Sequence, residues 1–237
     1  MKSTFLTIFA AACLLVGCSH NTDNTMTIRK INIDPTDSAA LEAALNTVEA
    51  QQISNCNWPE RAPYRPEASF RAFHTGEFLV IRYDVSEEST RAEASEDGGR
   101  VWEDSCVEFF ISPGSDDVYY NFEANCIGRM HIGHRKAGGS AELADGQTYG
   151  SIRRIASMQC GPYSLKEEPA DWNLTLIVPA SALYADSIRS WDGLKCTMNF
   201  YKCGDKSARE HFLSWAPIEN EKPNFHLPAF FGKVSFE

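Results

Sequence analysis

Four polar residues are predicted to lie on the outward face of neighbouring strands. Glu108 is the charged residue within the apolar run Val107–Ile111, and Glu123 and Asn125 take the polar positions of a second alternating run, with Arg129 shortly after it. Carboxylate, amide and guanidinium groups on one face could hydrogen-bond the hydroxyl groups of a ligand. The alternative is a solvated surface, where an exposed Glu–Arg pair contributes about 0–1 kcal/mol.

Two of the five tryptophans occupy positions that are unusual for core residues. Trp102 has acidic neighbours at the start of a strand-like run, and Trp215 comes just before a proline-containing loop. An exposed indole offers a flat apolar face that suits the C–H face of a sugar ring. The alternative is that each indole packs beneath its own loop, and composition alone favours that alternative.

The segments that must position these residues alternate with a period of two. Apolar and polar side chains alternate through five runs, at 78–85, 106–111, 120–126, 172–178 and 196–201. This pattern is typical of strands with one face in a core and one in water. Turn signals separate the runs and no long helical pattern lies between them, which excludes parallel βαβ units. The prediction is an all-β fold, an antiparallel β-sandwich of jelly-roll type.

One short helix is predicted ahead of the strands. Leu41, Leu45 and Val48 recur at helical spacing, and either Asp37 or Ser38 can cap the helix. The chain contains no internal repeat and no low-complexity linker. Residues 37–237 are therefore expected to form a single domain.

Three strings within this domain resemble carbohydrate-binding module family 9, in the form found in envelope lipoproteins of glycan-degrading bacteria. They are the segments 102–110 and 119–129 and the closing segment 212–232, which contains Ser-Trp-Ala-Pro-Ile and Phe-His-Leu-Pro-Ala-Phe-Phe-Gly. The resemblance covers roughly residues 58–236, nearly the whole predicted domain. It implies a jelly-roll sandwich that binds oligosaccharide or polysaccharide without catalysis.

The resemblance also implies a clamp around a terminal sugar ring. The family's two tryptophans correspond to Trp102 and Trp215, and its glutamate and arginine correspond to Glu108 and Arg129. Asn125, on the same predicted face, completes the expected carbohydrate-binding set. The amide that precedes the second tryptophan in the family has no clear counterpart here, so the resemblance does not specify the sugar.

Metal and disulfide chemistry receives little support from the sequence. The family's calcium sites rest on carboxylate loops that do not map onto this chain, so no metal and no cofactor is predicted and calcium stays open. The chain has no C-x-x-C motif, and its histidines show no metal-ligand or Ser-His-Asp grouping. No disulfide is assigned among the cysteines of the mature chain, which are Cys56, Cys106, Cys126, Cys160, Cys196 and Cys203.

The N-terminus carries the pattern of an exported protein. Lys2 precedes an apolar run at 5–16 that is too short to span a membrane and fits a signal peptide. Leu15-Val16-Gly17-Cys18 resembles the lipobox of bacterial lipoproteins. It predicts a signal peptide at 1–17, lipidation of Cys18, a tether through residue 36 and a lipid anchor in the cell envelope, most naturally the outer membrane. An ordinary signal peptide with a fortuitous cysteine is the alternative.

The charge balance restricts the partners of the chain. With 22 Lys and Arg against 32 Asp and Glu, the net charge is −10. This balance argues against sequence-independent nucleic-acid binding, which needs cations to neutralise phosphates. The expected partners are a glycan, a membrane through the N-terminal lipid, and enzymes that degrade glycans.

Two other function classes remain open at this point. Glu108 and Glu123 could serve as the two carboxylates of a glycosidase, which lie about 5 Å apart in retaining enzymes. Against this, the sequence shows no second lobe or lid to close a cleft. A protein-partner module of an envelope complex is the other alternative, in which the exposed indoles anchor a neighbouring subunit.

Overall fold

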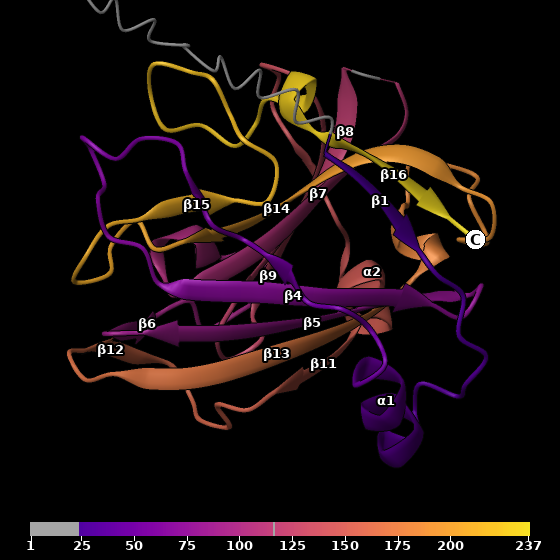
Figure 1. Cartoon of the computed structure of the whole chain (residues 1–237), viewed down its shortest axis with the longest axis horizontal. Helices are drawn as coiled ribbons and strands as arrows, with labels where there is room; N and C mark the ends of the chain where they lie inside the picture. The colour runs from indigo at the N-terminus through magenta and orange to yellow at the C-terminus, as the bar shows by residue number, and fades with distance from the viewer. Residues whose placement is uncertain (1–23, 116) are drawn as a thin grey trace, which may run out of the picture.

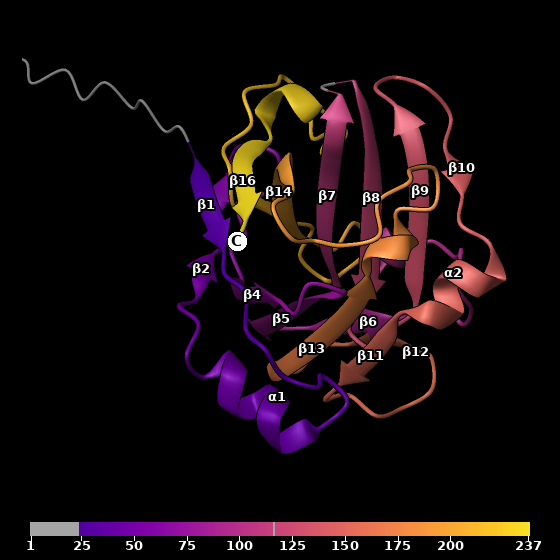
Figure 2. The same ribbon diagram turned by 90° about the vertical axis from the view of Figure 1, so that its right-hand side faces the viewer.

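Two β-sheets pack face to face in the computed structural model, which describes residues 24–115 and 117–237. Figures 1 and 2 show the two layers. The predicted signal peptide and Cys18 lie outside the described residues. The β-sandwich prediction is confirmed, and the five alternating runs lie in strands of these two sheets, with only Cys126 beyond a strand end.

The larger sheet carries the site described below. In spatial order its strands are β1 (Thr25–Ile28), β16 (Gly232–Phe236), β14 (Lys195–Cys203), β7 (Cys106–Ser115), β8 (Val118–Asn125), β9 (Met130–Lys136) and β10 (Glu142–Leu143). Two short strands extend it beside β14, namely β15 (Phe212–Ser214) and β3 (Asn55–Cys56). Its pairings are antiparallel except that β1 and β16 run parallel.

The smaller sheet is antiparallel and lies beneath the larger one. Its strands in spatial order are β11 (Arg153–Ala156), β13 (Ala170–Pro179), β5 (Phe78–Glu87), β4 (Glu67–His74) and β2 (Gln51–Gln52). A separate two-stranded sheet joins β12 (Tyr163–Lys166) to β6 (Thr90–Ala92). The remaining elements are α1 (Ser38–Leu45), α2 (Gly146–Ser151) and the short 3₁₀ turns Val101–Glu103, Ala180–Ala182 and Pro228–Phe230.

The principal core lies between the two sheets. Val107, Phe109 and Ile111 of β7 point into it, as their alternation predicts. Phe70 of β4 stacks on Phe200 of β14 with ring centroids 3.7 Å apart, which joins the smaller sheet to the larger one. The interdigitated inner faces fix the distance between the sheets and leave the opposite faces to be covered by other elements.

Both outer faces are covered over part of their area. On the smaller sheet, α1 lies against the outer face (Figure 2). Leu41 and Leu45 of this helix pack against Phe73, Val80 and Ile177. Asp37 caps this helix by accepting hydrogen bonds from the backbone N–H groups of residues 39 and 40. The predicted helix is thus confirmed, and α2 is an additional one.

The outer face of the larger sheet is covered by loops rather than by a helix. Outward-facing residues of β7, β8 and β14 pack beneath loop residues in a second apolar cluster, whose buried members are Trp58, Val101, Cys106, Phe110, Tyr119, Tyr201, Cys203, Ile218, Phe225 and Phe231. The polar face of the sequence pattern is therefore largely buried in its central strands. This second cluster surrounds the candidate site.

The N-terminal strand belongs to the fold. Thr25–Ile28 forms β1 and pairs with Lys233–Phe236, beside the C-terminus in Figure 1. This pairing corrects the expected tether through residue 36, because residues 25–28 already form a strand of the larger sheet. No described helix has the length and apolar character needed to cross a membrane.

Candidate functional site

A cavity of about 330 Å³ opens on the outer face of the larger sheet. Its lining combines groups from the sheet, from the turn before β7 and from the loops after β14 and β15: Trp102, Glu108, Glu123, His131, Arg135, Cys203, Asp205, Phe212, Pro223, Asn224, Phe225 and His226. The volume falls at the lower end of the range for small-molecule sites, about 300–1,000 Å³.

The floor of the cavity comes from one row of cross-strand neighbours, of which Glu108, Glu123 and His131 line the cavity. Strand register places Tyr201, Glu108, Glu123 and His131 side by side on β14, β7, β8 and β9. Because successive side chains of a strand point to opposite faces, all four lie outward from the principal core. The two glutamates are nevertheless only 2% and 4% exposed.

The two buried carboxyl groups resist ionisation. Burial raises the pKa of Glu108 to about 8, and thiol hydrogen bonds from Cys203 and Cys106 oppose this shift. Burial also raises the pKa of Glu123 well above its usual value, and the neighbouring charge of Glu108 adds to the shift. At neutral pH this floor therefore presents carboxylic acid protons as well as acceptor oxygens.

Arg135 supplies the guanidinium of the cavity. It lies on the same face of β9 as His131, separated from it by Gly133, and its Nε donates to Asn121 Oδ1 at 3.1 Å. Asn121 in turn donates to Glu123 at 2.8 Å. A Cβ at Gly133 would lie only 2.9 Å from Asn121 Oδ1, so this glycine leaves the space that the Arg135–Asn121 pair occupies.

Trp102 projects into the cavity from the turn before β7. Asp104, two residues on, is 1% exposed and accepts hydrogen bonds from the backbone N–H groups of Glu93 and Ala94. The carbonyl of Trp102 also accepts the N–H of Asp205. These hydrogen bonds hold the turn in place. The Trp102 indole remains half-buried and makes a T-shaped contact with the His131 ring.

A second aromatic group comes from β15 and the loop that follows it. Phe225 stacks on Tyr201 with centroids 4.1 Å apart, and half-buried Phe212 lies edge-on to it at 6.1 Å. Asn224 places an amide in the lining, and its Oδ1 accepts the N–H of His226. This loop therefore contributes both apolar surface and a polar group.

The histidines of the cavity are held neutral. Burial lowers the pKa of His226 to about 4, and the positive charge of Arg135 adds to this shift. Its Nδ1 lies 3.0 Å from the Tyr119 hydroxyl, which can donate to it. Burial likewise lowers the pKa of His131, whose Nδ1 faces the carbonyl of Gly98 at 3.2 Å and leaves Nε2 as an acceptor.

Trp215 does not take the expected place as a cavity wall. It is 8% exposed and lies in the principal core, edge-on to Phe70 and Phe200 with centroids 6.3 and 5.9 Å away. Its ring also approaches Gly232 so closely that a Cβ there would meet the indole at 2.5 Å. The structure therefore separates Trp215 from Trp102 and corrects the predicted clamp.

Arg129 and Asn125 also fall outside the cavity lining. Arg129 is exposed in the turn between β8 and β9, and its backbone N–H donates to Asn125 Oδ1. The Asn125 amide donates to Asp104, so Asn125 joins this turn to the one that carries Trp102. Of the five expected carbohydrate-binding residues, Trp102 and Glu108 meet in the cavity and the other three support or lie apart from it.

Some of the lining residues that were missed left a signal in the sequence. His131, Gly133 and Arg135 follow the period-two pattern on one face of β9, which points to Arg135 rather than to Arg129. Pro223, Asn224, Phe225 and His226 belong to the closing string that carries the family resemblance. Cys203 and Asp205 reach the cavity because β14 pairs with β7, which is distant in the sequence. No local sequence pattern could have predicted their place in the lining.

The described residues contain one group suited to binding a metal ion, Cys106, Glu108 and Cys203. Calcium binds through six to eight oxygen ligands, and two thiols do not suit it. All six cysteines of the described chain are present as free thiols.

Comparisons with known proteins agree with this architecture. The family model of carbohydrate-binding family 9 matches residues 38–236. The crystal structure of a Bacteroides uniformis protein described as carbohydrate-binding is 43% identical over 90% of this chain and 99% of that chain, with a TM-score of 0.86.

Two more distant structures share the fold. They are family 9 modules from Caldicellulosiruptor kristjanssonii in complex with glucose (11% identity, TM-score 0.59) and with cellotriose (10% identity, TM-score 0.54). Both matches cover 90% of this chain. They cover 96% of the glucose-bound module and 93% of the cellotriose-bound module. No curated protein matches the chain.

Proposed function

The chain belongs to carbohydrate-binding family 9, and we propose that its cavity binds a sugar ring without catalysing a reaction. The observation that carries this proposal is the half-buried indole of Trp102 beside a floor of hydrogen-bonding groups. An apolar wall beside convergent polar groups suits a sugar, which has an apolar C–H face and a polar rim.

The walls of the proposed site differ from a clamp of two tryptophans. Trp102 provides one apolar surface, and Phe212 and Phe225 provide a second from a different element. Glu108 and Arg135 reach the hydroxyl groups from the floor, and Asn224 takes the place of the amide that the sequence does not provide next to Trp215. Few polar contacts and a small ligand imply micromolar to millimolar affinity.

A binding role fits the carboxyl pair better than a glycosidase role does. Glu108 and Glu123 are direct cross-strand neighbours, so they have the proximity that a retaining enzyme needs. A glycosidase, however, separates the two pKa values so that one group is an acid and the other an anion. Here burial raises both. Incubation with oligosaccharides should therefore release no new reducing ends, and steady release of them would contradict a purely binding role.

The ligand we propose is a gluco-configured oligosaccharide. The support is that family 9 modules of the same fold have been solved with glucose and with cellotriose. The test is calorimetric titration of the chain with both sugars. Trp102→Ala should weaken binding by about 1–3 kcal/mol through lost apolar contact area. Leu143→Ala, which removes an exposed apolar side chain outside the cavity lining, should bind as the wild type does. If Trp102→Ala folds normally and binds unchanged, the site lies elsewhere.

We further propose that the protein is a lipoprotein of the cell envelope that presents this cavity to glycans and to the enzymes that degrade them. The support is the lipobox-like string ending at Cys18. Cys18→Ser should abolish incorporation of labelled palmitate and release the protein from the membrane fraction. Equal labelling of the variant would contradict the proposal.

A further inference from the structure

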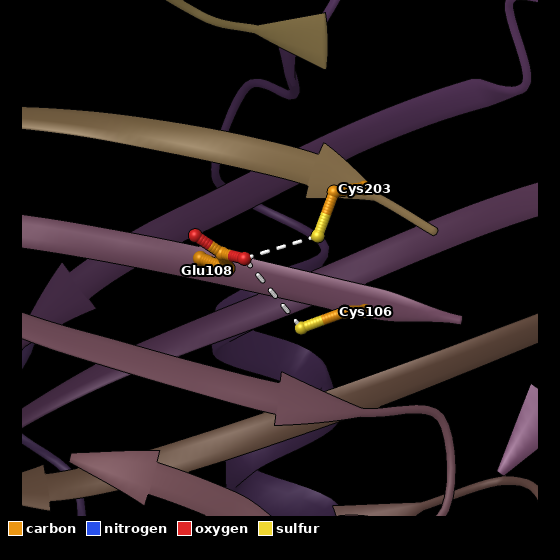
Figure 3. A group of neighbouring side chains, drawn as sticks. All are labelled: Cys106, Glu108 and Cys203. Carbon is orange, nitrogen blue, oxygen red and sulfur yellow. Dashed lines mark hydrogen bonds between the residues drawn. The ribbon is translucent and has the colours of Figure 1, made fainter. Parts of the chain in front are cut away.

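Two thiols and a carboxyl group meet at one edge of the cavity floor. Cys203 on β14 is the direct cross-strand neighbour of Cys106 on β7, and Glu108 follows two positions along β7 on the same face. The thiols of Cys203 and Cys106 lie 3.0 and 3.7 Å from Glu108 Oε1, and the three potential ligand atoms all lie within 4.8 Å of one another (Figure 3). All three residues are buried, at 0–2% exposure.

Among the described residues, no cationic side chain is hydrogen-bonded to the side chains of this group. The hydrogen bonds that Glu108 receives come from thiols, which are weak donors. Its neighbour Glu123 has a buried Oε2 without a hydrogen-bond partner among the described residues. The nearby ammonium group of Lys202 is engaged by Glu87 and His211, and Arg135 donates to Asn121. Several groups that can lose a proton thus meet without a cation assigned to them.

We propose that Cys106, Glu108 and Cys203 form a zinc-binding site in the floor of the cavity. Zinc binds cysteine sulfur at about 2.3 Å and carboxylate oxygen at about 2.0–2.2 Å. Tetrahedral ligands at these lengths lie roughly 3.5–3.8 Å from one another. The separations of 3.0 and 3.7 Å and the outer limit of 4.8 Å bracket that spacing, so small side-chain rotations would complete the set.

The donor set selects the kind of metal ion. Two thiolates with one carboxylate suit zinc, whereas calcium and magnesium prefer oxygen donors alone. On binding, Zn²⁺ displaces the protons of both thiols, and of Glu108 where it is protonated, to solvent. Glu108 and Cys203 line the cavity, so the fourth ligand position can be taken by water or by an oxygen of a bound molecule.

No local sequence motif marks the proposed zinc site. Cys106 and Cys203 come from different parts of the chain and meet only through the pairing of β7 with β14. The inference does not rest on sugar binding, although the two sites share Glu108.

Cobalt titration of the untagged, reduced full-length chain tests the proposal. Co²⁺ should bind with a thiolate-to-metal charge-transfer band, and Zn²⁺ should abolish the band by displacing it. Cys203→Ser should remove the band and weaken zinc binding by more than the roughly 10–100-fold that follows loss of an outer-shell partner. Cys196→Ser, a substitution on the same strand outside the cavity lining, should keep both.

Several results would overturn the site. One is a wild-type chain that takes up Co²⁺ without a charge-transfer band, a measurement that requires no variant. A second is equal zinc affinity in Cys203→Ser and in the wild type. A third is a Cys106–Cys203 disulfide in protein purified without reductant. Trp102→Ala should bind zinc normally while losing sugar affinity, so a failure of sugar binding can be distinguished from a failure of the zinc site.

Discussion

Arg135 reaches the cavity because the residue two positions before it is glycine. Gly133 leaves room for the contact between Arg135 and Asn121, and the Asn121 amide donates a hydrogen bond to Glu123. The guanidinium is thereby fixed over the floor before a ligand arrives, which reduces the conformational entropy lost on binding.

Replacement of Arg135 should therefore affect sugar binding, and replacement of Arg129 should not. Arg135→Gln should weaken sugar binding by about 1.5–3 kcal/mol, the usual contribution of a hydrogen bond to a charged group. Arg129→Gln is the matched control, since that side chain is exposed in a turn. Calorimetric titration of both variants is the measurement, and equal losses would show that Arg135 has no specific contact.

Trp215 belongs to the core, so its replacement should act on stability. Trp215→Ala removes a large side chain packed against Phe70 and Phe200 and should lower the free energy of unfolding by about 3–5 kcal/mol. Trp102→Ala, at a half-buried position, should cost much less. Urea denaturation of the two variants compares them directly, and a stable Trp215→Ala that has lost sugar binding would restore the two-tryptophan clamp.

The outcome for these side chains shows what alternation can and cannot predict. The period of two places Glu108 and Glu123 on the outward face correctly, because that depends on strand geometry alone. It does not predict what covers that face, and here the loops around Phe225 and Ile218 bury it. The resemblance predicted Trp215 as a wall, but a tryptophan next to a loop can turn into the core as readily as out of it.

At the scale of elements, the position of β16 depends on close contact between a glycine and an indole. A Cβ at Gly232 would lie 2.5 Å from the Trp215 ring and 2.6 Å from the carbonyl oxygen of Asn24. The strand can therefore approach the core and β1 together only without a side chain at this position.

Gly232→Ala should separate β16 from its neighbours. We expect a loss of about 1–3 kcal/mol in unfolding free energy, typical of overpacking. Gly150→Ala is the control, because a Cβ there meets nothing within 4 Å. Thermal unfolding of both variants measures the difference, and an equally stable Gly232→Ala would mean that the indole moves aside freely.

The strands themselves were predictable because each alternating run is bounded by turn residues. The pairing order was not predictable, since β14 meets β7 from a distant part of the chain. The cavity depends on that order, which is why its floor could be predicted only in part.

At the scale of the whole molecule, acidification should change the free energy of unfolding in opposite directions through His226 and Glu108. The pKa of His226 falls from 6.5 to about 4 on folding, so between these values the unfolded chain binds a proton that the folded chain does not. Its contribution to stability is therefore lost as the pH falls from about 6.5 to 4, by at most about 3 kcal/mol. Glu108 has the opposite effect, because its pKa rises from 4.5 to about 8 on folding. The folded chain holds this proton more tightly than the unfolded chain, so the Glu108 contribution to stability increases as the pH falls from about 8 to 4.5.

Comparison of the wild type with His226→Gln isolates the histidine contribution. The unfolding free energy of the wild type should fall more steeply between pH 7 and 4 than that of the variant. The titratable groups facing this ring, Arg135 and His131, are the same in both proteins. Parallel pH profiles would show that His226 protonates freely in the folded chain.

The pairing of β1 with β16 has a consequence for the order in which the chain can fold. The hydroxyl groups of Thr27 and Ser235 lie 3.2 Å apart although 208 positions separate them in the chain. Contacts over such separations form late, because a long loop must close before they stabilise anything. During synthesis from the N-terminus, β1 cannot pair with β16, its strand partner among the described residues, until residues 232–236 are made. Until then the edge of β14 at Lys195–Met198, which β16 later covers, stays open to pairing with another chain.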